Sequence, residues 1–89
     1  MAISAQNFSI GTAAQRIVSR DDNPQHVILH NHEHANNHEI YYGVSNVTTT
    51  TGMHLQHTET IQIVIAPGDE LWAIADGADR DLRVLIRNV

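Results

Sequence analysis

A histidine-rich stretch at residues 30–39 holds the side chains of this sequence best suited to chemistry. It reads HNHEHANNHE, with four histidines and two glutamates in ten residues. Imidazole and carboxylate groups are common ligands of catalytic metal ions. His32 and His34 stand two positions apart, so on a strand both would face the same way and could converge on one ion. Glu39 could add a third, negatively charged ligand.

This spacing resembles the first metal motif of the cupins, a His-x-His pair followed a few residues later by Glu. The matching residues here are His32, His34 and Glu39. The resemblance implies a small metal-binding β-barrel enzyme. Two departures weaken it: His26 stands where a glycine is expected, and the segment from Pro67 to Ala75 lacks the further histidine of the second motif.

A solvated connection between two strands is the other interpretation of the histidine stretch. Asn, His and Glu are common in loops, and Ala35-Asn36-Asn37 suits a turn. In a ring of identical subunits the loop would meet its own copies, and protonation or a bound metal would then change the contact. We therefore expect a surface connection whose chemistry, where it has any, is contact between subunits.

Other candidate catalytic groups lie at turns. Asp69 and Glu70 follow Gly68, and Asp76 precedes Gly77. Because Asp favours turns, we expect capping and solvation there rather than acid–base catalysis. The serines lie in no nucleophile-elbow context, and the chain has neither a phosphate-binding loop nor a dinucleotide fingerprint. We predict no catalysis and no cofactor.

Short runs rich in Val, Ile and Thr recur along the chain between Gly, Pro, Asn and Asp. They span residues 7–11, 14–20, 25–31, 39–45, 47–58, 60–66, 70–76 and 81–89. About six to eight short strands indicate an all-β fold, a small antiparallel β-sandwich or jelly-roll-like barrel. Alternation with period two predicts the inward residues Val27, Leu29, Ile61, Ile63, Ile65, Leu82, Val84 and Ile86.

The chain length of 89 residues indicates one domain with a thin core. Residues 1–12 are polar and weakly patterned, so we expect an N-terminal arm that orders against a neighbouring subunit, followed by a β-sandwich domain at 13–89. Such a small sandwich would gain stability from oligomerisation.

Composition excludes several classes of function. The chain has no cysteine, so it forms neither a disulfide framework nor a thiolate zinc site. Ten acidic residues against five Lys and Arg give a formal charge of −5, which argues against nucleic-acid binding. The apolar runs are too short to span a membrane, and the first residues do not read as a secretory signal.

From His26 onward the sequence resembles small structural proteins of tailed bacteriophages, particularly head decoration or cement proteins. The residues that carry the resemblance are Asn31, Tyr42-Gly43, Val47-Thr48-Thr49, Gly52 with Leu55, Leu71-Trp72-Ala73-Ile74 and Val84-Leu85-Ile86. They cover about two-thirds of the chain, and they are strand and turn punctuation rather than chemical signatures. The histidine stretch departs from the pattern.

The resemblance implies a virion component, assembled in the host cytoplasm, that binds and stabilises the major capsid protein shell. It also implies a symmetric homo-oligomer, with a trimer favoured, although some proteins of this pattern serve in tails. Exposed aromatic residues and the apolar residues of the arm would anchor such contacts. The interface residues we predict are Ile3, Phe8, Tyr41, Tyr42 and Trp72. A glycan-binding or host-surface module stays open, because exposed Trp and Tyr can stack on sugars.

Overall fold

The computed structural model describes residues 3–88, which form eight β-strands and no helix. The strands are β1 (Ile3–Ile10), β2 (Gln15–Val18), β3 (Gln25–Asn31), β4 (Ile40–Gly43), β5 (Met53–Leu55), β6 (Thr60–Ile65), β7 (Leu71–Ala75) and β8 (Arg80–Asn88). Each overlaps a run predicted from the sequence, and β3 coincides with its run. No helix among these residues is long and apolar enough to cross a membrane.

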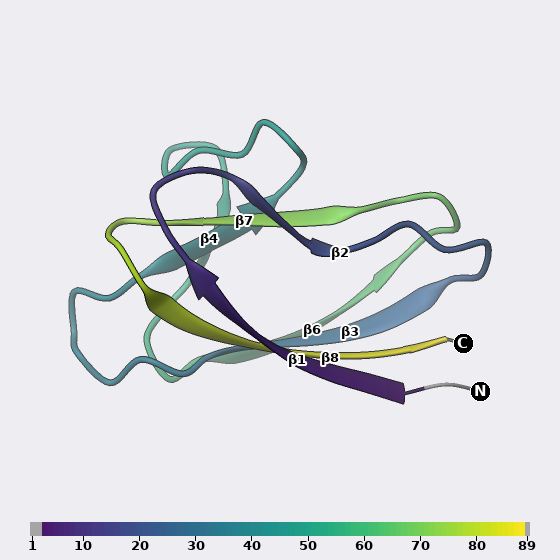
Figure 1. Cartoon of the computed structure of the whole chain (residues 1–89), viewed down its shortest axis with the longest axis horizontal. Helices are drawn as coiled ribbons and strands as arrows, with labels where there is room; N and C mark the ends of the chain where they lie inside the picture. Colours follow the sequence, from purple (N-terminus) through teal and green to yellow (C-terminus); the bar gives the residue numbers. More distant parts are fainter. Residues whose placement is uncertain (1–2, 89) are drawn as a thin grey trace.

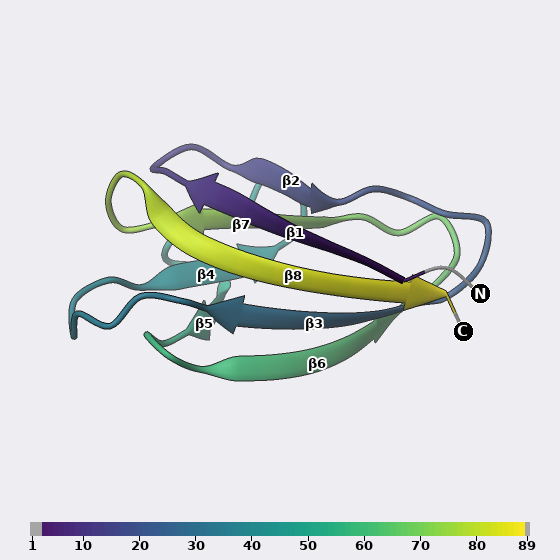
Figure 2. The same ribbon diagram turned by 60° about the horizontal axis from the view of Figure 1, so that its bottom comes forward.

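Two four-stranded sheets face each other (Figures 1 and 2). The first has the order β1-β8-β3-β6 and the second β2-β7-β4-β5. All neighbouring strands are antiparallel. This is the strand order of an eight-stranded jelly roll, in which consecutive strands β1 to β4 alternate between the sheets. The predicted all-β sandwich is confirmed.

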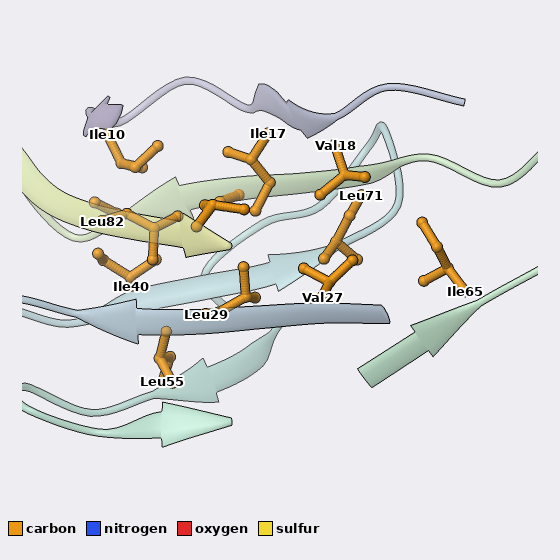
Figure 3. Close-up of a cluster of buried hydrophobic side chains, with 13 residues drawn as sticks. Ile10, Ile17, Val18, Val27, Leu29, Ile40, Leu55, Ile65, Leu71 and Leu82 are labelled. Atoms are coloured by element: carbon orange, nitrogen blue, oxygen red, sulfur yellow. The ribbon is translucent and has the colours of Figure 1, made fainter. Parts of the chain in front are cut away.

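The core fills the space between the two sheets with aliphatic side chains (Figure 3). Val27 and Leu29 from β3 are fully buried, as their alternation predicts. Leu82 and Val84 from β8 are also buried. On β6 the inward residues are less well covered, and only Ile65 is buried, because β6 is an edge strand of its sheet. The sandwich is therefore a packed core rather than a barrel with a lumen.

Residues 3–10 of the predicted arm belong to the sandwich as β1. This strand pairs with β8 along its whole length, from Ile3 opposite Arg87 to Ile10 opposite Arg80. Ile10 is fully buried, whereas the first five residues of β1 are exposed. The strand's start extends beyond the cover of the second sheet, so its sequence lacks the strong apolar alternation of a covered strand. Residues 1 and 2 of the predicted arm lie outside the described residues.

Candidate functional site

The histidine loop, residues 32–39, connects β3 in the first sheet to β4 in the second and is fixed by one buried amide. Asn31, at the end of β3, is fully buried. Its Nδ2 donates to the main-chain oxygens of His38 at 3.1 Å and Leu55 at 3.0 Å. Its Oδ1 accepts a hydrogen bond from the Glu33 main-chain N–H at 3.1 Å. Asn31 thus ties both ends of the loop to β5.

Glu33 closes the loop against β8. Its Oε2 accepts a hydrogen bond from the Asp81 main-chain N–H at 3.0 Å, and its Oε1 lies 2.6 Å from His38 Nδ1. The Asp81 N–H, followed by the hydrogen bond to His38, lowers the pKa of the Glu33 carboxyl below its ordinary value. Glu33 therefore acts as a structural acceptor, because both of its oxygens are occupied within the chain.

Three imidazoles lie in a row where β3 runs into the loop. The ring centroids of His30 and His32 are 5.3 Å apart, and those of His32 and His34 are 5.4 Å apart. Asp81 lies beside this row. The Arg83 guanidinium, hydrogen-bonded to Asp81 at 3.0 Å, is the main cause that lowers the Asp81 pKa, and the charges of His32 and His30 lower it further.

Glu39, the predicted third metal ligand, lies with other partners. Its carboxylate is 3.1 Å from His54 Nε2 and 3.8 Å from His57 Nδ1. No group of three or more His, Cys, Asp or Glu side chains within residues 3–88 is arranged to hold a metal ion. The predicted ligand set of His32, His34 and Glu39 is therefore not assembled. The physical reason is topological: Glu39 leads into β4 of the second sheet, whereas His32 and His34 follow β3 of the first.

The contact of Glu39 with His54 and His57 was missed in the sequence. Within the described residues, Glu39 Oε2 and His57 Nδ1 are buried and have no hydrogen-bond partner. Tyr41 stacks on His54 with ring centroids 4.9 Å apart and an interplanar angle of 18°. The signal is the pairing of β4 with β5, which places Tyr41 opposite His54. Local spacing does not reveal which strand pairs with which.

The five predicted interface residues do not share one surface. Phe8 and Tyr42 pack against the core from inside the sandwich, and burial raises the pKa of the Tyr42 hydroxyl. Trp72 is half-buried, and its Nε1 donates to Glu70 Oε1 at 3.4 Å. Tyr41, opposite Ile74, lies on the outer face of the second sheet. Their roles in contacts between chains stay a prediction.

Ile3 lies on a different surface, the outer face of the first sheet, where it is 66% exposed. Val64 at 62% and Leu85 at 39% are exposed on the same face. Strand pairing gathers alternate residues of the four strands there, and we call this surface the basic sheet face. Its central residues are Ile3, Ala5, His26, Ile28, His30, Val64, Arg83, Leu85 and Arg87.

Shallow hollows show that the apolar side chains of the basic sheet face are contiguous. One is lined by Ile3, His26, Ile28, Leu85 and Arg87. Its neighbour shares Ile28 and Leu85 with the first. Arg83, Leu85 and Arg87 alternate with the buried Leu82 and Val84 along β8. The sequence carried this signal, because the outward half of the alternation mixes arginine with leucine.

No protein-family model and no curated protein sequence matches this chain. A solved structure from the endospore appendages of Bacillus, which form a family of disulfide-linked pili, is similar in fold. The TM-score is 0.57 with 9% sequence identity, over 99% of this chain and 86% of that chain. At this identity the similarity shows the shared jelly-roll fold alone.

The comparison also marks a chemical difference. The pili of the similar structure are disulfide-linked, whereas this chain has no cysteine. Covalent cross-linking through sulfur is therefore impossible here, and contacts between copies have to come from surface complementarity.

Proposed function

We propose that this protein is a structural component of a bacteriophage virion, a capsid decoration or cement protein. In this proposal it binds the major capsid protein on the capsid surface as a symmetric oligomer, with a trimer favoured. Its role is to stabilise the shell, and it carries out no catalysis. The fold is compatible with this role, since jelly rolls occur in capsid and lectin domains, but also in cupins.

One observation carries the proposal: the apolar surface that could bind a partner lies on an outer sheet face, while the interior is filled. Ile3, Val64 and Leu85 are exposed there together with Ile28. The space between the sheets holds aliphatic side chains. A flat, exposed apolar surface is typical of contacts between proteins, whereas small-molecule sites are concave.

The similar Bacillus structure supports the coarser part of the proposal. It shows that a jelly roll of this size occurs in pili, which are structural. The resemblance of the strand punctuation, such as Tyr42-Gly43 and Leu71-Trp72-Ala73-Ile74, favours a tailed-phage virion over an appendage.

The test is reconstitution with capsids. Purified full-length protein is added to phage capsids that lack it, and bound protein is measured by co-sedimentation and shell stability by thermal melting. We expect saturable binding and a higher capsid melting temperature. Capsids that neither bind the protein nor gain heat resistance would overturn the proposal.

A metal analysis separates the cupin-like alternative. Elemental analysis of the purified protein is compared with that of the His32→Ala variant. A stoichiometric metal that the variant loses would support the metal-enzyme alternative and count against the structural role. We expect no such metal, because Glu39 lies with His54 and His57 rather than with His32.

A further inference from the structure

We propose that the basic sheet face of one copy binds the acidic turn end of a second copy, so that copies associate head to tail. The acidic turn end comprises residues 20–23 and 67–70. This inference rests on the proposed function only in taking the chain to be an oligomeric subunit. It adds which two surfaces meet and excludes a face-to-face dimer through this sheet.

The charge of the basic sheet face is opposite to that of the whole chain. The chain carries ten carboxylates and five arginines. Asp81 is the one carboxylate at an outward strand position of the first sheet, and it is paired with Arg83. Arg87 is exposed, donates from Nε to His26 Nδ1 at 3.2 Å, and forms no ion pair with a carboxylate among residues 3–88.

An uncompensated arginine beside exposed apolar side chains indicates a partner that is both apolar and acidic. Arg87 lines the same hollow as Ile3, Ile28 and Leu85. Two copies meeting through this face by a two-fold axis would bring their arginines together. Like charges at an interface cost free energy, so the face-to-face arrangement is disfavoured.

The acidic turn end has the complementary properties. The β2–β3 and β6–β7 turns lie side by side there, since the Gly68 N–H donates to the Asp21 main-chain oxygen at 2.9 Å. Glu70 takes the nearby arginines, with Arg16 at 3.2 Å and Arg20 at 3.7 Å. Asp21, Asp22 and Asp69 form no ion pair within the described residues.

Apolar surface adjoins these carboxylates. Asp69 and Glu70 line a hollow together with Val44, Ile65 and Trp72. Val44 is 66% exposed. Each copy thus presents an arginine beside an apolar stripe and, elsewhere, an unpaired carboxylate beside an apolar hollow. Matching unlike surfaces gives a heterologous contact.

The directions of the two surfaces determine what the contact builds. The basic sheet face covers the flat side of the sandwich, whereas the turn end closes one end of it (Figure 2). Because the two surfaces face different directions, each added copy is turned relative to the last. Repetition then gives a closed ring or a helix rather than a straight stack. A trimeric ring is compatible with this geometry, and a two-fold dimer through the basic sheet face is not.

Charge-reversal variants test the proposal. Association of the full-length chain is measured by sedimentation velocity over a range of concentrations and salt. We expect the wild type to associate, and added salt to weaken the contact because ions screen exposed charges. Arg87→Glu alone and Asp69→Arg alone should each weaken association about tenfold or more. An equimolar mixture of the two variants should restore it, because the carboxylate introduced in one variant then faces the guanidinium introduced in the other.

Matched controls change the same net charge elsewhere. Thr49 and Thr50 are exposed in the loop before β5. Thr49→Glu with Thr50→Glu matches Arg87→Glu, and Thr49→Arg with Thr50→Arg matches Asp69→Arg. Both controls should associate like the wild type. Circular dichroism of every variant verifies that the fold is retained.

Three outcomes overturn the inference: a wild type that stays monomeric at all concentrations, controls that weaken association as much as the test variants, or rescue of Arg87→Glu by wild type rather than by Asp69→Arg. The last result would indicate the face-to-face contact. A chain that associates as expected but does not bind capsids would overturn the proposed function and leave this inference standing.

Discussion

His38 Nδ1 lies 2.6 Å from Glu33 Oε1, which makes this pair the shortest side-chain contact in the histidine loop among the described residues. The other Glu33 oxygen accepts the Asp81 main-chain N–H. Glu33 therefore links the loop to β8 through a carboxylate that is only 18% exposed. A stretch that resembles a metal motif in the sequence is held by a carboxylate with an architectural role.

Glu33→Gln should destabilise the fold and reduce its acid sensitivity. The Asp81 N–H and His38 lower the Glu33 pKa below 4.5, so the charged carboxylate stabilises the folded state above about pH 4.5. This stabilisation is lost as the pH falls through the lower pKa of the folded state. At neutral pH we expect a loss of about 1–2 kcal/mol, measured by urea unfolding.

The comparison that decides this prediction is the gap between wild type and Glu33→Gln from pH 7 down to pH 3. The gap should narrow as the wild type loses its charge. Asp22→Asn, at an exposed carboxylate, is the control and should differ little from the wild type. A gap that stays constant over this range would show that the Glu33 charge does not contribute.

Asn31→Asp should be much more damaging than the same change on the surface. The Nδ2 group donates to two main-chain oxygens, and replacing it with a carboxylate oxygen would set acceptor against acceptors in a fully buried site. We expect a loss of about 3 kcal/mol or more in chemical unfolding. Asn36→Asp, in the exposed part of the loop, should change stability little. Equal effects of the two substitutions would contradict the role of Asn31.

Local patterns were enough to predict most of the strands and the inward faces of the central ones. Val27 and Leu29 are buried because alternation on a strand is a local property that a covering sheet reinforces. The edges were harder to predict. The start of β1 is exposed, so its sequence shows little alternation, and it read as an arm.

The candidate site was harder to predict than the strands because its contacts depend on strand order. The sequence places Glu39 five residues from His34, yet the jelly-roll crossover brings Glu39 to His54 and His57 instead. The basic sheet face depends in the same way on pairing of β1, β8, β3 and β6. Its residues are separated by long stretches of chain, so no spacing rule could have gathered them.

Gly52→Ala should destabilise the protein through a direct steric clash. A Cβ at this position would lie 2.7 Å from Tyr41 Cβ and 2.8 Å from Val47 Cγ2. The loop before β5 would have to move away from β4, at a cost of about 1–3 kcal/mol in thermal or urea unfolding. Gly11→Ala is the matched control, because nothing lies within 4 Å of a Cβ there. If the control loses as much stability as Gly52→Ala, the close approach is not the cause.

His26 should hold one neutral tautomer on the basic sheet face. Arg87 Nε donates to His26 Nδ1 at 3.2 Å, so Nδ1 has to be unprotonated. Nε2 lies 2.9 Å from Gln62 Oε1 and is then the N–H donor. Long-range ¹⁵N–¹H NMR spectra in mildly alkaline solution distinguish the two nitrogens. We expect a pyridine-type Nδ1 and a pyrrole-type Nε2, whereas Arg87→Ala should weaken this preference. The opposite tautomer in the wild type would rule out the Arg87–His26–Gln62 hydrogen-bond chain across the face.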